Sequence, residues 1–78
     1  MGVQELLSLI LDTVRARLRN GEFTERALAR RVGVSQAHLH NVLKGARALT
    51  PAQADRICGE LGISVLVLAD RRARDKAA

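Results

Sequence analysis

The chain has 78 residues, of which 47% are hydrophobic, and Phe23 is its one aromatic residue. A chain of this length supports one compact domain and leaves no room for a separate catalytic or ligand-sensing domain. The core must be built from aliphatic side chains, a composition that favours packed helices. Cys58 is the single cysteine, and neither a secretory signal nor a membrane-spanning run is visible. We therefore expect a soluble protein of the reducing cytoplasm.

The net charge of +5 is distributed unevenly along the chain. Residues 15–47 contain eight Arg or Lys and two Glu, a sum of +6, whereas residues 1–14 and 48–70 each sum to −2 and residues 71–78 to +3. Concentrated positive charge favours a polyanionic partner, because each neutralised phosphate releases condensed counterions. Blocks of charge also form solvated surfaces without any ligand. Charge alone leaves both interpretations open.

Hydrophobic spacing predicts a first helix that begins near Val3 and is closed by Asn20-Gly21. Thr24 is placed to cap a second, short helix, which Gly33 can end with a positive φ. Ser35 is placed to cap a third helix, which Gly45 stops. The residues expected to face the core are Val3, Leu7, Ile10, Leu11, Val14 and Leu18 in the first helix, Leu28, Ala29 and Val32 in the second, and Leu39, Val42 and Leu43 in the third.

A fourth helix is predicted from Thr50-Pro51-Ala52-Gln53, which has the pattern of a capping box with proline at the first helical position. Gly62 ends it, and Ala54, Ile57, Cys58 and Leu61 are expected to face inward.

The segment 65–69 is ambiguous. Ser64 can cap a fifth helix there, whereas the alternating β-branched residues equally suit a strand; we favour the helix. The basic residues that follow predict a disordered tail. The expected organisation is therefore one domain over residues 1–70 and a tail over residues 71–78.

Two short helices joined by Gly33-Val34-Ser35 must cross at a steep angle, and the small Ala29 allows them to approach closely. The face of the third helix opposite its buried side would then point to solvent. It carries Gln36, Ala37, His40, Asn41 and Lys44. Glutamine and asparagine can pair with the major-groove edge of adenine, alanine can contact a thymine methyl group, and lysine can bind phosphate. The pattern predicts that the helix over residues 35–44 lies in the major groove of double-stranded DNA.

Several features of this region occur together and in register, namely Ala29, Gly33, Val34-Ser35-Gln36, Leu39, Gly45 and Leu61-Gly62-Ile63. With these features, residues 24–45 resemble the helix-turn-helix of the lambda-repressor/Cro family, also called the XRE family. Their sequence is T-E-R-A-L-A-R-R-V-G-V-S-Q-A-H-L-H-N-V-L-K-G. The resemblance covers roughly residues 5–68. It implies an all-α fold, a compact bundle of four or five helices that binds operator DNA, commonly as a symmetric dimer, with the third helix as recognition helix.

Carried over position by position, the base-reading residues of the family correspond to Gln36, Ala37 and Asn41, with His40 beside them. The resemblance also implies phosphate contacts from the start of the second helix, from the residues after Gly45 and from polar or basic positions that flank the two helices. These positions hold Thr24, Ser35, His38, Lys44 and Arg47.

Two positions depart from the family pattern. Glu25 stands where many members have a glutamine that binds phosphate, and a carboxylate would repel phosphate. Glu25 can instead pair with a neighbouring arginine or interact with the N-terminal helix dipole. Ala37 is small for a base-reading position, so specificity can be modest or depend partly on DNA shape.

No catalytic or metal-binding constellation is visible. His38 and His40 are two residues apart and therefore lie on different faces of a helix, and no metal-ligand spacing joins them to a cysteine or carboxylate. Cys58 lies on an inward stripe and is interpreted as a packing residue. Paired carboxylates, a phosphate-binding glycine loop and a Ser/His/Asp arrangement are all missing. We predict that the protein is no enzyme and needs neither metal nor other cofactor.

We therefore predict a sequence-specific transcription regulator located at the nucleoid, and a repressor in particular, because so short a chain has little surface for recruiting polymerase. The five consecutive apolar residues 65–69 cannot all face so small a core. We expect a homodimer through this segment, with Leu6 or Leu9 contributing. The alternative is a protein-interaction module of the antitoxin or adaptor type that uses the same fold. Neither a membrane nor a small-molecule ligand is expected.

Overall fold

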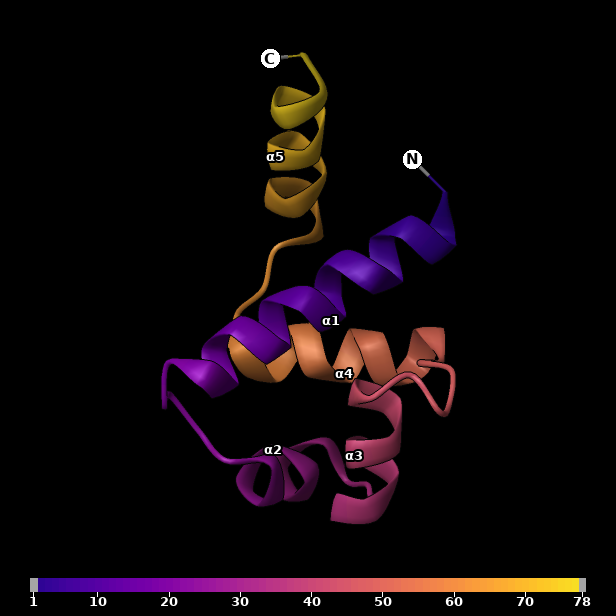
Figure 1. Ribbon diagram of the computed structural model, residues 1–78, viewed down its shortest axis with the longest axis vertical. Helices are drawn as coiled ribbons and strands as arrows, with labels where there is room; N and C mark the ends of the chain where they lie inside the picture. Colours follow the sequence, from indigo (N-terminus) through magenta and orange to yellow (C-terminus); the bar gives the residue numbers. More distant parts are fainter. Residues whose placement is uncertain (1, 78) are drawn as a thin grey trace.

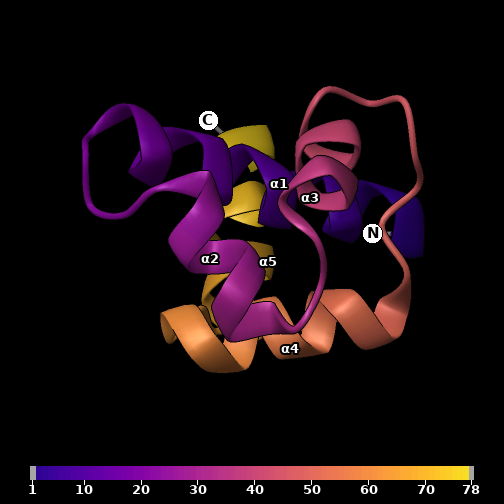
Figure 2. The same ribbon diagram turned by 90° about the horizontal axis from the view of Figure 1, so that it is seen from below.

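The computed structural model describes residues 2–77, and Figure 1 shows five helices in that part of the chain. They are α1 (Val3–Arg19), α2 (Glu25–Val32), α3 (Gln36–Leu43), α4 (Pro51–Leu61) and α5 (Val65–Ala77). Residues 2–77 contain no strand, so the prediction of an all-α fold is confirmed. The molecule measures 38 × 24 × 20 Å, with α5 at one end of the long axis and α2 and α3 at the other (Figures 1 and 2). No helix in this range is long and apolar enough to cross a membrane.

Short-range signals set the helix boundaries. The Thr24 hydroxyl accepts a hydrogen bond from the Ala27 amide at 3.1 Å and begins α2, and the Ser35 hydroxyl accepts one from the His38 amide at 3.0 Å and begins α3. Thr50 and Gln53 form the predicted reciprocal capping box at the start of α4. Each of these partners lies within three residues, which is why the sequence alone predicted these helix starts.

The core lies where α1, α2, α3 and α4 meet. Its buried residues are Ile10, Val14, Leu28, Ala29, Val32, Leu39, Val42, Leu43, Leu49, Ala54, Ile57 and Cys58. One expectation needs correction, and one core residue was not predicted. Val3 was expected to face inward, but it is 65% exposed because α1 extends past the core at its first turn. Leu49 is buried although it lies in the loop before α4, where helical periodicity gives no signal.

The ambiguous segment 65–69 is the beginning of α5, which packs against α1. Ser64 precedes it and accepts a hydrogen bond from the Val67 amide at 3.4 Å. Residues 71–77, which were expected to form a disordered tail, continue this helix, so the expected division after residue 70 falls inside α5. The Arg72–Glu5 ion pair, at 2.6 Å, joins the middle of α5 to α1. Ala78 lies outside the described residues.

Candidate nucleic-acid interface

The turn between α2 and α3 has the predicted length of three residues, Gly33-Val34-Ser35. Gly33 has φ +80°, a conformation that costs L-residues with a side chain but not glycine. The amides of Gly33 and Val34 both donate to the Ala29 carbonyl, at 2.9 and 3.0 Å, and close the end of α2. Ala29 itself is buried. This short turn, closed by two hydrogen bonds, holds α3 at a defined angle to α2.

The outer face of α3 carries the four residues that the sequence predicted to read bases. Gln36, Ala37 and His40 are exposed, and Asn41 is half-buried. Together with Glu25 from the first turn of α2 they line one shallow depression. None of the four side chains belongs to the hydrophobic core. The structure therefore brings these residues together on one accessible surface, which we call the α3 outer face (Gln36, Ala37, His40 and Asn41).

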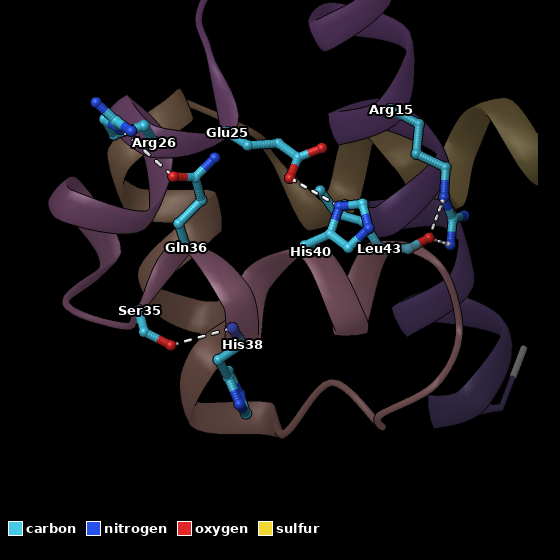
Figure 3. A network of polar contacts seen from close by, with 8 residues as sticks. All are labelled: Arg15, Glu25, Arg26, Ser35, Gln36, His38, His40 and Leu43. Carbon is cyan, nitrogen blue, oxygen red and sulfur yellow. Dashed lines mark hydrogen bonds and ion pairs between the residues drawn. The ribbon is translucent and has the colours of Figure 1, made fainter.

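Gln36 and Asn41 are held differently. The Gln36 side-chain oxygen accepts a long hydrogen bond, 3.4 Å, from Nε of Arg26 in α2 (Figure 3). This contact leaves the Gln36 amino group without a partner among residues 2–77. The backbone carbonyl of Asn41, rather than its side chain, accepts hydrogen bonds from the Ala46 and Arg47 amides, at 2.9 and 3.2 Å. Asn41 thus ties the loop after α3, including the exposed Arg47, to the helix itself.

Four of the five predicted phosphate contacts are exposed beside this face: Thr24, Ser35, Lys44 and Arg47. The hydroxyls of Thr24 and Ser35 each accept a backbone amide as helix caps. A capping hydroxyl still has its own proton to donate, so the same groups remain able to bind a phosphate oxygen. Neither Lys44 nor Arg47 forms an ion pair with another of the described residues.

The fifth residue, His38, turns toward α4 instead. Its Nε2 lies 2.9 Å from Nε2 of Gln53, and its side chain is partly buried. The Gln53 side-chain oxygen is already occupied, since it accepts the Thr50 amide in the capping box at 3.2 Å. Gln53 must therefore donate through Nε2, and His38 Nε2 must accept, which requires a neutral imidazole with its proton on Nδ1. His38 serves mainly to join α3 to α4.

Glu25 contacts His40, a partner that the sequence did not indicate for it. Its carboxylate lies 3.1 Å from Nδ1 of His40, whereas an arginine or the helix dipole was expected to interact with it (Figure 3). The two side chains are 32% and 57% exposed, respectively. The pair spans the first residue of α2 and the middle of α3, a juxtaposition that depends on the angle between the helices.

Arg15 of α1 also contributes to the site, although the sequence marked it only as positive charge. Its Nε donates to the Leu43 carbonyl at the end of α3 at 2.9 Å, and Nη2 donates to the same oxygen. Nη1 pairs with Asp12 at 3.1 Å. A cation at a helix C-terminus satisfies carbonyls that lack a partner within the helix. The residues are 28 positions apart, and no sequence motif indicates such a contact.

Cys58 has the packing role that the sequence indicated. It is buried on α4, and burial, followed by the negative charge of Asp55, raises the pKa of its thiol. A raised pKa keeps the thiol protonated and unreactive near neutral pH. Within residues 2–77, no group of three or more His, Cys, Asp or Glu side chains could hold a metal ion.

Comparison with known families agrees with this geometry. A family model described as helix-turn-helix matches residues 14–68, which is more than half of the chain and includes α2, the turn and α3. Comparisons with curated proteins and with solved structures gave no match. The turn, the buried Ala29 and the exposed outer face of α3 are the features that the sequence resemblance implied. The chain belongs to the helix-turn-helix family of the lambda-repressor, or XRE, type, whose members are DNA-binding regulators.

Proposed function

We propose that this protein is a sequence-specific transcriptional repressor that places α3 in the major groove of double-stranded DNA. The observation that carries the proposal is the α3 outer face, on which Gln36, Ala37, His40 and Asn41 lie together outside the core. A major groove admits one α-helix, and direct readout needs side chains that offer hydrogen-bond donors and acceptors to base edges. The outer face of α3 meets both requirements.

Contacts with the DNA backbone would position this helix. Thr24 and Ser35 stand at the starts of α2 and α3, and Lys44 and Arg47 stand after the end of α3, so the four surround the outer face at both ends. Backbone contacts of this kind fix the register of the protein on DNA and carry little sequence information. His38 is left out of these contacts because its Nε2 is bonded to Gln53.

A selection from a random DNA library at two salt concentrations tests the proposal. We expect one enriched motif and a steep fall in affinity with salt. Gln36→Ala should cost about 1–3 kcal/mol on the preferred sequence and relax the preference at one base, whereas Arg47→Ala should weaken all sequences similarly. Gln4→Ala, which removes an exposed glutamine at the far end of α1, is the matched control and should change neither. No enriched motif, or equal binding by all variants, would contradict the proposal.

The exposed apolar residues of α5 support a homodimer. Val65, Leu66 and Val67 are 39%, 82% and 49% exposed, respectively, at the start of that helix. A second copy would cover them and would present two α3 helices to successive major-groove half-sites, about 34 Å apart. We expect light scattering to find a dimer at micromolar concentration and a monomer for Leu66→Glu. A wild-type monomer would count against this dimer.

The same surface supports the alternative, a protein-interaction module of the antitoxin or adaptor type. In that case the exposed side of Leu66 would contact an unrelated protein instead of a second copy. Co-purification of one such protein at fixed stoichiometry, in the absence of nucleic acid and lost on Leu66→Glu, would favour this alternative. Absence of such a partner, together with an enriched DNA motif, would favour the repressor.

A further inference from the structure

A hydrogen bond on the candidate interface joins Glu25 to His40 of the α3 outer face, and neither residue belongs to the hydrophobic core. The Glu25 oxygen and His40 Nδ1 are 3.1 Å apart. An ionised carboxylate only accepts hydrogen bonds, so the imidazole must carry a proton on Nδ1 in order to bind it. The carboxylate thereby fixes which ring nitrogen is protonated and, in the neutral ring, leaves Nε2 as an acceptor.

The second nitrogen of this ring is available to a ligand. Nε2 of His40 forms no hydrogen bond with any of the described residues, and Figure 3 shows it on the side of the ring away from Glu25. His40 lines the same depression as Gln36, Ala37 and Asn41. His40 also borders a second depression. The charged residues that line this depression are Arg15 and Arg19 of α1, Glu25 of α2, and Lys44 after α3.

We propose that Glu25 is a positioning residue for base specificity, because it makes His40 Nε2 the group that His40 presents to the DNA. This inference rests on the proposed function and deepens it. A neutral His40 then presents an acceptor, which matches the amino group on the major-groove edge of adenine or cytosine. A protonated His40 presents a donor instead, which matches the two acceptors of guanine. The carboxylate at this position thus selects a base rather than binding phosphate.

The pair also explains how an acidic residue is tolerated next to DNA. Glu25 is the first residue of α2, where the helix dipole favours a negative charge, and its carboxylate is engaged by His40. Arg15, Arg19 and Lys44 line the depression beside the pair and add positive charge around it.

The test uses the full chain and the DNA duplex recovered from the library selection, together with all single-base variants of that duplex. For the wild type at pH 8 we expect one position at which adenine or cytosine is preferred by on the order of 3- to 10-fold, the effect of one hydrogen bond. Glu25→Gln offers both a donor and an acceptor to Nδ1 and should reduce the preference to less than about 2-fold.

His40→Ala should lose the preference at the same position, and the double variant should show no further loss. Glu22→Gln is the matched control, because it removes the same charge from the exposed loop before α2 and should leave the base ranking unchanged. Circular dichroism of each variant confirms that it is folded. An enriched motif with the same ranking for wild type, Glu25→Gln and His40→Ala would overturn this inference and leave the proposed function intact. The absence of any motif for the wild type would overturn both.

Discussion

Replacing Arg15 by methionine tests whether α1 holds α3 in place. The change keeps an unbranched apolar stem and removes the guanidinium that donates twice to the Leu43 carbonyl. A hydrogen bond to a charged group contributes about 1.5–3 kcal/mol, but the Arg15 side chain is 35% exposed and solvent screens it. We therefore expect a loss of about 1 kcal/mol in the free energy of unfolding, which lowers the Tm of a domain of this size by about 4–8 °C.

Urea and thermal unfolding followed by circular dichroism measure this loss. Arg19→Met is the matched control, because Arg19 lies one turn further along α1, is exposed, and forms no hydrogen bond or ion pair with other described residues. Both variants remove one positive charge, so their difference measures the contacts of the Arg15 guanidinium with the Leu43 carbonyl and with Asp12. Equal stability of the two variants would refute the idea that Arg15 fixes the end of α3.

Three further predictions concern contacts described above. Gln53→Met keeps the length of the side chain but removes both the capping-box acceptor and the donor to His38, so it should cost about 1–2 kcal/mol in chemical unfolding. Ile57→Ala empties a site that is 1% exposed and should cost about 2–5 kcal/mol in chemical unfolding. Cys58, with a pKa raised by burial, should react with iodoacetamide at pH 8 much more slowly in the native protein than in urea.

Each of these has a clear contrary result. Equal stability of Gln53→Met and wild type would show that neither contact of the Gln53 side chain stabilises the fold. A cost below about 1 kcal/mol for Ile57→Ala would mean that the site collapses around the smaller side chain. Equal rates of Cys58 alkylation in the native and unfolded protein would show that the thiol is accessible in the fold.

Much of the fold could be predicted because its signals act over a few residues. The caps at Thr24, Ser35 and Thr50 each bind an amide three positions away. The left-handed conformation at Gly33 is a local backbone requirement, and the buried stripe of each helix follows from its period of 3.6 residues. The exposed outer face of α3 is the complement of its buried stripe. The sequence therefore predicted which residues of α3 face solvent.

The contacts between helices could not be predicted in this way. The sequence gives no distance between Glu25 and His40, or between Arg15 and Leu43, because these pairs depend on the angles at which complete helices pack. His38 and His40 look alike as sequence, yet packing turns one toward Gln53 and the other toward Glu25. Periodicity determined the local elements and their apolar faces, whereas only the tertiary structure decided which polar groups meet, since those groups are separated along the chain and joined by the core between them.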